Sequence, residues 1–443
     1  MPLRLLISPS DMMSGSRRRT PVTLAISVGL LVTLPGAGRA TLGAQPKPPA
    51  IPSPGGPPPL TAPLCKGESA ILVDAITGTV LWQKNSRVRR PVASTTKIMA
   101  ATVAIESGRL SDLITFSKHA TQTPYGNLHA KPGEQLRLYD LLYAILLRSS
   151  NDGCVAVGEH LFGSGYAYAQ AMTRRAQELG ATDTNFITPN GLHDPRHFST
   201  AFDLSTMARH ALSIPLFSEI VRTRSFTVER SINQQDCLIK NHNRFVGAYE
   251  GGDGVKTGYV KQAGRCLVAS STRTEQGRPW RLISVVLRSP DMYGDSARLM
   301  DWGRSNFQPI FAAQSGAPAA TAPVEGGTQE TATLVATQDL HFIVSRSAAA
   351  RLDYHLDRTL RAPLRPSEPV GTLSVRLDGQ VLGQVNVVNG HAVTQNWTAA
   401  AAPWTGAPLL LAALVWGPKY ARTITKSARR RRRRLPSGRN GTH

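Results

Sequence analysis

Residues 91–108 read PVASTTKIMAATVAIESG, a polar start followed by an apolar run that predicts a buried helix. Ser94 precedes Lys97 by three residues, and side chains with this spacing are neighbours on a helix. A lysine whose pKa is lowered by burial or by a nearby cation can accept the serine proton, which would make Ser94 a nucleophile. Alternatively, Ser94 or a threonine beside it only caps the helix. An S-x-x-K match is expected about once by chance in a chain of this length, so other motifs must decide.

A second motif, Ser149-Ser150-Asn151, interrupts a helical pattern. The segment LRLYDLLYAILL at 136–147 predicts a helix, and CVAVGEHLF at 154–162 resumes one. The S-x-N motif is therefore expected in a turn between two buried helices.

A third motif lies in GVKTGYV, residues 254–260, which predicts a strand. Lys256 gives this strand a cation, and the small Gly258 lets a ligand backbone lie alongside it. All three motifs in this order are expected by chance far less often than any one of them. The combination therefore favours Ser94 as a nucleophile.

The other patterns predict a sheet and a second domain. ILVDAITGTVLWQKN at 71–85 predicts a hairpin, and SFTVER (225–230), GRCLVASSTR (264–273) and RLISVVLRS (281–289) predict strands of one antiparallel sheet together with 254–260. Beyond Trp302, short alternating segments predict a small all-β domain. Because it lacks a cluster of residues suited to chemistry, we interpret it as a spacer or interaction module.

The two ends of the 443-residue chain carry much of its net charge of +22. At the N-terminus, SRRRTPVTLAISVGLLVTLPGAGRA (16–40) has the basic start, apolar core and small residues of a secretory signal, although an uncleaved anchor is an alternative. A proline-rich stretch then predicts an extended linker.

Near the C-terminus, about 20 mostly apolar residues (398–417) precede the arginine run 429–434. This pattern favours a membrane span with the arginines inside the cell. An interfacial helix held to anionic lipid is the competing interpretation, and export argues against nucleic-acid binding.

The four cysteines allow a disulfide in an exported protein, but the sequence selects no pairing. Cys154 and Cys266 lie in apolar runs, which favours buried thiols. No motif indicates a metal ion or an organic cofactor. The expected organisation is a signal peptide at 1–44, a linker at 45–63, a catalytic domain at 64–305, an all-β domain at 306–396, an anchor segment at 397–420 and an arginine-rich cytoplasmic tail at 421–443.

The three motifs resemble the S-x-x-K, S-x-N and K-T-G set of serine penicillin-recognising enzymes. FITPNGLHDPRHFSTAFDL (186–204), NHNRFV (241–246) and GGDGVKTGYVKQAGRCLVAS (251–270) are similar, more narrowly, to the low-molecular-weight D-alanyl-D-alanine carboxypeptidases. The likeness covers about residues 66–305. It implies an α+β, β-lactamase/transpeptidase-like domain, an antiparallel sheet flanked by helices, followed by the small all-β domain.

The resemblance also implies a reaction. Ser94 would attack the carbonyl of the penultimate D-alanine of a peptidoglycan stem peptide, with Lys97 as base, and water would hydrolyse the acyl-enzyme. Ser149 would relay a proton to the leaving amine, and Asn151 would steady the substrate or Lys97. β-Lactams would act as covalent inhibitors.

The K-T-G strand would hold the substrate. Lys256 and Thr257 would bind its carboxylate, next to the small Gly258, and the backbone N–H groups of Ser94 and Tyr259 would bind the oxyanion. The arginine that many relatives use for the carboxylate has no secure counterpart; Arg288 and Arg298 are candidates.

Other residues suggest alternative sites or functions. His193 and Asp194 invite a Ser-His-Asp triad, although the lysine already supplies a base. Asp203 is expected to start a helix. Alternative functions are an endopeptidase of peptide cross-links, a β-lactamase, which would need a deacylating carboxylate motif that we do not find, and a non-catalytic wall-binding module.

Overall fold

The structure is a computed structural model that describes residues 61–347, 352–377 and 379–396. The signal, most of the linker, the anchor segment and the arginine-rich tail, which the sequence predicts, lie outside the described residues. Within them, no helix is both long and apolar enough to cross a membrane.

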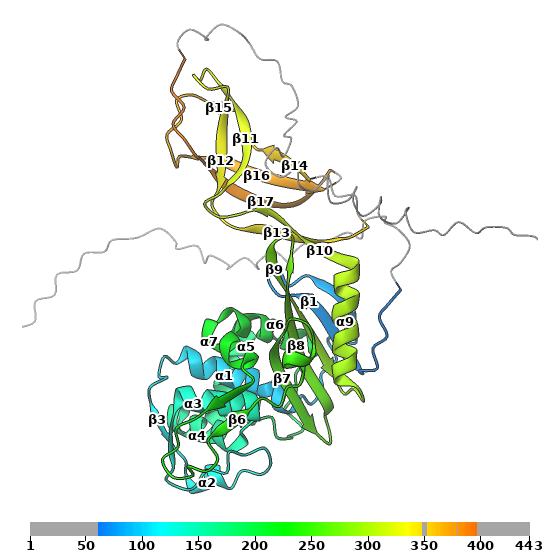
Figure 1. Cartoon of the computed structure of the whole chain (residues 1–443), viewed down its shortest axis with the longest axis vertical. Helices are drawn as coiled ribbons and strands as arrows, with labels where there is room; N and C mark the ends of the chain where they lie inside the picture. The colour runs from blue at the N-terminus through cyan, green and yellow to red at the C-terminus, as the bar shows by residue number, and fades with distance from the viewer. Residues whose placement is uncertain (1–60, 348–351, 378, 397–443) are drawn as a thin grey trace, which may run out of the picture. The chain divides into compact units, whose positions relative to one another are not determined.

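A five-stranded antiparallel sheet forms the centre of the first domain (Figure 1). Its strand order is β2 (Val80–Lys84), β1 (Ser69–Asp74), β9 (Arg278–Leu287), β8 (Gly264–Glu275) and β7 (Gly252–Val260). The β1–β2 hairpin is the predicted one, and β7, which carries the K-T-G motif, lies at the edge. An edge strand leaves one row of backbone groups free for a ligand.

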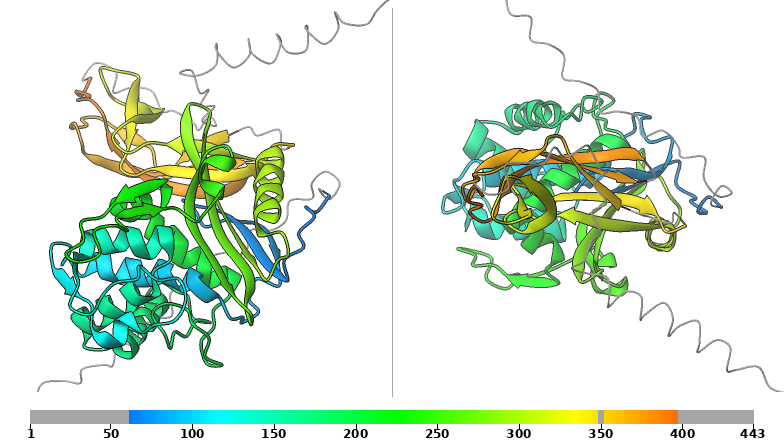
Figure 2. Two further views of the ribbon diagram at one scale, coloured as in Figure 1. Left: turned by 60° about the horizontal axis from the view of Figure 1, so that its bottom comes forward. Right: turned by 90° about the horizontal axis from the view of Figure 1, so that it is seen from above.

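Helices cover both faces of this sheet because its strands alternate between two cores. Ile71 and Val73 of β1 belong to the larger core, whereas Leu72 packs in the core that contains Leu299 and Met300 of α9 (Met292–Asn306). Figures 1 and 2 show α9 on the face opposite the helical cluster. This arrangement confirms the predicted α+β fold.

The helical cluster buries the S-x-x-K and S-x-N segments. Its members are α1 (Lys97–Glu106), α2 (Lys118–Thr121), α3 (Leu138–Tyr143), the π-helical η2 (Ala144–Arg148), α4 (Asn151–Phe162), α5 (Gly165–Glu178), α6 (Ala201–Ser213) and α7 (Pro215–Arg222), and the short α8 (Phe245–Ala248) precedes β7. Two small antiparallel sheets border it, β3 (Leu113–Thr115) with β4 (Gln135–Arg137) and β5 (Ser225–Thr227) with β6 (Leu238–Lys240).

Two expectations about these elements were wrong. Only the first three residues of SFTVER form a strand, β5, which pairs with β6, the next strand along the chain, and does not join the five-stranded sheet. Residues 135–137 form strand β4, so the helix predicted from 136 begins at Leu138.

The second domain contains, among its described residues, strands β10–β17 and their turns (Figure 2). β10 (Phe307–Ala313) pairs with β13 (Leu340–Ser345). The six-stranded arrangement has the order β14 (Leu352–Leu356), β16 (Pro369–Leu377), β17 (Gln380–Asn389), β12 (Thr331–Ala336), β11 (Pro318–Glu325) and β15 (Leu360–Arg361). Leu334, Leu373 and Val385 belong to its buried core, which confirms the predicted all-β domain.

All four cysteines are free thiols. Cys154 and Cys266 are completely buried, as their apolar neighbours predicted. Burial raises the pKa of each of these two thiols to about 11, so both are protonated at neutral pH.

Candidate active site

Ser94 lies in a 3₁₀ turn, η1 (Ala93–Thr96), directly before α1. The hydroxyls of Thr95 and Thr96 donate back to the carbonyls of Val92 and Ala93, at 2.7 and 2.8 Å, and so tighten the turn. No side chain caps the N-terminus of η1 or α1. The capping alternative for Ser94 is therefore wrong, and its hydroxyl faces the site.

Lys97 is completely buried beside this hydroxyl. Its Nζ donates to Ser94 Oγ at 3.0 Å, to Asn151 Oδ1 at 2.6 Å and to the Asn190 carbonyl at 2.7 Å. Desolvation lowers the pKa of Lys97 to about 8, and Cys154 and Asp152 oppose this shift only in part. A lysine in this position can reach the neutral form that a base requires.

The S-x-N motif lies where the sequence predicts it. Ser149 adopts a left-handed conformation (φ 69°) that ends η2, and Asn151 is the first residue of α4. The Asn151 amide nitrogen donates to the carbonyls of Pro124 and Tyr125 at 3.0 and 3.1 Å, which orients its oxygen toward Lys97. Ser149 is half-buried.

The K-T-G motif meets the serine turn along β7. A Cβ atom at Gly258 would lie 3.0 Å from both Ser94 N and Val92 O, so only glycine allows the two backbones this approach without a shift. Tyr259, the next residue, is 67% exposed. The backbone amides assigned to the oxyanion therefore belong to two segments in close contact.

Lys256 is a second fully buried lysine in this region. Desolvation and the charge of Lys97 lower its pKa to about 7. Its Nζ donates to the carbonyl of Thr257 at 3.1 Å. A bound carboxylate would restore the charged form, because an opposite charge favours ionisation of the lysine.

The triad and arginine candidates that the sequence suggested are exposed or paired with other side chains. His193 is exposed and Asp194 pairs with Arg196 at 3.0 Å, so these residues do not form a triad with Ser94. Arg288 pairs with Glu68, and Arg298 pairs with Asp291 and Asp295.

Asp203 lies in the first turn of α6, as predicted, where its carboxylate accepts from the amide of Asp183 and the hydroxyl of Thr184. Asn241 and Asn243 form a turn ahead of β7, in which Asn241 Nδ2 donates to the carbonyls of Val221 and Thr223.

Two residues of the site were not predicted from the sequence. Asn190 supplies a carbonyl to Lys97, and His197, completely buried, lies 2.9 Å from Thr96 Oγ1 through Nε2. His197 Nδ1 accepts from the amides of Ile187 and Thr188, so Nε2 carries the proton. The sequence PNGLHDPRH already predicts a turn, but nothing in it indicates contact with residues roughly 100 positions earlier.

The arrangement as a whole suits acyl transfer. It combines a serine hydroxyl, a buried lysine of lowered pKa, a second buried lysine and an edge strand that can align a peptide. Among the described residues, no group of three or more His, Cys, Asp or Glu side chains is arranged to hold a metal ion.

Comparison with known proteins matches both domains to known families. Residues 59–291 match the D-alanyl-D-alanine carboxypeptidase family, and residues 307–395 match the penicillin-binding protein 5 C-terminal domain. D-alanyl-D-alanine carboxypeptidase DacA of Escherichia coli K12 is 32% identical, over 73% of this chain and 82% of the relative. DacF of Bacillus subtilis is 28% identical, over 72% of this chain and 84% of the relative.

Solved structures show the same fold. Penicillin-binding protein 5 from Haemophilus influenzae has a TM-score of 0.61 and 28% identity, covering 76% of this chain and all of that one. Fold and motifs together define a penicillin-recognising serine enzyme. The chain belongs to the D-alanyl-D-alanine carboxypeptidase family of serine peptidases, among the low-molecular-weight penicillin-binding proteins.

Proposed function

We propose that this chain removes the terminal D-alanine from peptidoglycan stem peptides as a serine-type D-Ala-D-Ala carboxypeptidase. The observation that carries the proposal is the buried Lys97 Nζ, 3.0 Å from Ser94 Oγ and otherwise bonded to neutral oxygens of Asn151 and Asn190. Without a carboxylate among these partners, the lysine keeps the lowered pKa of about 8 that a general base needs.

Acylation begins when neutral Lys97 takes the hydroxyl proton of Ser94. The bond from Oγ to the penultimate carbonyl carbon forms, and the bond from that carbon to the nitrogen of the terminal D-alanine breaks. The proton passes from Lys97, by way of the Ser149 hydroxyl, to the departing amine. Water then attacks the ester carbon, the bond from that carbon to Oγ breaks, the shortened peptide leaves as a carboxylate, and a proton from the water restores the Ser94 hydroxyl.

Substrate binding falls to the K-T-G strand. Lys256 and the Thr257 hydroxyl bind the terminal carboxylate, and the peptide extends along the free edge of β7. The N–H groups of Ser94 and Tyr259 stabilise the oxyanion, and each such donor is worth about 10² to 10³ in rate. β-Lactams, which carry a carboxylate and a reactive amide, acylate the same serine.

The enzyme works in the cell envelope, where its substrate lies. The sequence supports export by a signal within 1–44, a linker at 45–63, a catalytic domain at 64–305, an all-β domain at 306–396, a membrane anchor at 397–420 and a cytoplasmic tail at 421–443. The family matches at 59–291 and 307–395 support the two central boundaries.

Labelling of the full chain with a fluorescent penicillin tests the site. We expect one covalent adduct per chain, located by mass spectrometry on the peptide that contains Ser94, and no adduct in Ser94→Ala. An adduct on another residue, or labelling that survives the substitution, would overturn the assignment.

A further inference from the structure

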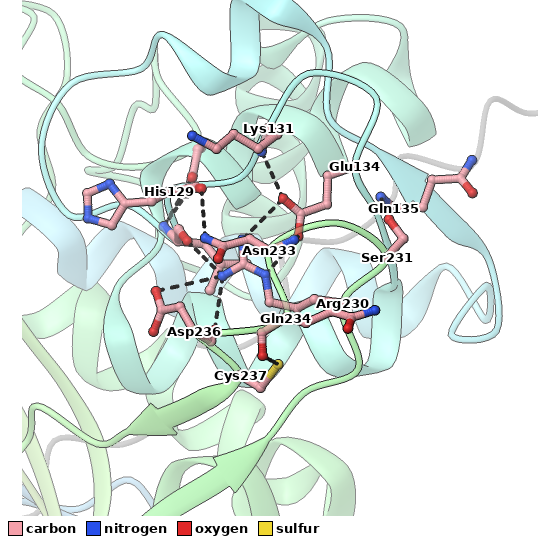
Figure 3. A network of polar contacts seen from close by, with 12 residues as sticks. His129, Lys131, Glu134, Gln135, Arg230, Ser231, Asn233, Gln234, Asp236 and Cys237 are labelled. Atoms are coloured by element: carbon pink, nitrogen blue, oxygen red, sulfur yellow. Dashed lines mark hydrogen bonds and ion pairs between the residues drawn. The ribbon is translucent and has the colours of Figure 1, made fainter.

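Arg230 and Glu134 form a buried ion pair, which Figure 3 shows together with its polar neighbours. Arg230 Nε donates to Glu134 Oε1 at 2.7 Å and Nη2 donates to Oε2 at 3.2 Å. Both side chains have 0% exposure. The backbone amides of Lys131 and Asn233 also donate to the Glu134 carboxylate, so its charge is well compensated.

The guanidinium of Arg230 also joins two segments that are about 100 residues apart in the sequence. Its Nη1 donates to the carbonyl of Leu128 at 3.0 Å and to that of Asp236 at 2.9 Å. Only a planar group with several fixed N–H donors can make these contacts together. Arg230 thus holds the loop before β4 against the connection between β5 and β6.

The loop held in this way contacts the S-x-N motif directly. The amide of Leu128 donates to both carboxylate oxygens of Asp152 at 3.0 Å, so this residue is bonded to Arg230 on one side and to α4 on the other. Three consecutive carbonyls just before it, at 124–126, accept from the Asn151 backbone and side-chain amides. Asn151 in turn accepts from Lys97.

A second set of contacts reaches Ser149. The Asp236 carboxylate accepts from Arg148 Nη1 at 2.7 Å, and Arg148 directly precedes the left-handed Ser149. The Asp236 carbonyl is one of the acceptors of Arg230. Both functional residues of the S-x-N motif are therefore connected to the same guanidinium.

We propose that Arg230 and Glu134 are positioning residues that hold Asn151 and Ser149 in register with Lys97 and Ser94. The inference rests on the proposed function. Stability alone gives little reason for such a pair, because replacing a buried ion pair by apolar residues is often neutral or stabilising. By donating to the carbonyls of Leu128 and Asp236, Arg230 fixes the two residues whose amide and carboxylate contact Asp152 and Arg148 beside the motif, a role that an apolar pair cannot fill.

The test compares acylation rate constants of full-length variants with a fluorescent penicillin under single-turnover conditions. Arg230→Lys keeps the charge but loses the planar set of donors, and Arg230→Met with Glu134→Leu removes both charges together. We expect the limiting acylation rate constant to fall by roughly 10- to 100-fold, as for a misplaced catalytic group. The penicillin concentration that gives half of this rate constant should change by less than about threefold. If the pair were merely structural, the substitutions would lower the melting temperature but would not lower the limiting rate constant at a nearly unchanged half-saturating concentration.

The matched control is Arg175→Lys. Arg175 makes a bidentate pair with Glu106, at 2.9 Å for both contacts, between α5 and the far end of α1. Its ion-pair and hydrogen-bond partners include no residue of the proposed site. We expect acylation by this variant to match the wild type at temperatures where both are folded.

Asp236→Asn keeps both buried charges and tests the second set of contacts if the other variants fail to fold. Its side chain is 33% exposed, so the fold should tolerate the change, and we expect acylation to slow by about threefold or more. Folded variants that acylate within twofold of the wild type would overturn the inference. A wild type that is not acylated at all would instead overturn the proposed function.

Discussion

The Nζ atom of Lys97 lies 3.0 Å from the Oγ atom of Ser94, inside a site where the lysine has no access to water. Burial makes the ammonium form costly, and the contacts with Asn151 and Asn190 hold the amine on the serine. Lys256 is the second buried lysine of the site, and desolvation together with the charge of Lys97 lowers its pKa to about 7. The fold thus places an amine of lowered pKa next to a serine hydroxyl before any substrate arrives.

The two lysines should give opposite pH dependences. In the proposed mechanism neutral Lys97 is the base, so the limiting acylation rate constant should rise with pH through about 8. The proposed mechanism also has charged Lys256 bind the carboxylate, so affinity for a penicillin should fall as pH rises through about 7. Stopped-flow acylation between about pH 5.5 and 9.5 separates the two effects. A rate constant that does not change with pH would contradict the role of Lys97.

Arginine substitutions should separate the roles of the two lysines. A guanidinium cannot lose its proton in this pH range, so Lys97→Arg should lower the acylation rate constant by about 10² to 10⁴. Lys256→Arg keeps the charge that binds the carboxylate and should retain most of the affinity. Single-turnover acylation of both variants checks this, with melting temperatures as the control for folding. Equal losses of acylation rate constant and of affinity in the two variants would show that the two lysines do not differ in role.

Asn151→Asp should move the pH profile toward higher pH. A carboxylate at the present position of the amide oxygen would lie beside Lys97 and stabilise its charged form. The midpoint of the acylation profile should therefore rise by about one pH unit or more. Asn151→Ala, which removes the contact without adding a charge, is the comparison and should not raise the midpoint. A midpoint that stays unchanged in the aspartate variant would argue against contact between the two side chains.

Gly258→Ala should slow acylation while the protein stays folded. The new Cβ would lie 3.0 Å from Ser94 N and from Val92 O, so the serine turn must shift away from β7. We expect a loss of roughly 10-fold or more in the acylation rate constant. Gly165→Ala is the matched control, because its nearest contact would be an ordinary 3.6 Å to Pro189. Loss of activity in both variants would point to a general effect on folding.

Local patterns in the sequence were sufficient for much of the fold. Alternation of apolar residues predicted β1, β2, β8 and β9, and the break after Leu147 predicted the turn at Ser149. These local patterns failed where contacts between distant segments determine which strands pair. The SFTVER segment has a strand pattern that suits either sheet, and the pattern alone does not reveal that its strand pairs with β6.

The site residues that belong to short sequence motifs could be predicted. Ser94, Lys97, Asn151 and Lys256 each lie in a short pattern whose chemistry can be read from residue types. The contributions of Asn190 and Arg230 were not predictable from the sequence, because Asn190 acts through a backbone carbonyl and Arg230 through a buried ion pair. Such contacts depend on which segments the fold brings together, and a single sequence carries no signal for them.

The most direct test of the proposed activity is release of D-alanine from a peptide that ends in Lys-D-Ala-D-Ala, measured with the full chain beside Ser94→Ala. We predict release by the wild type and none by the variant, with similar melting temperatures for the two proteins. Release that persists without the Ser94 hydroxyl would contradict the mechanism. A folded, penicillin-labelled wild type that releases no D-alanine would contradict the carboxypeptidase assignment, and cleavage of cross-linked peptides by that protein would identify an endopeptidase.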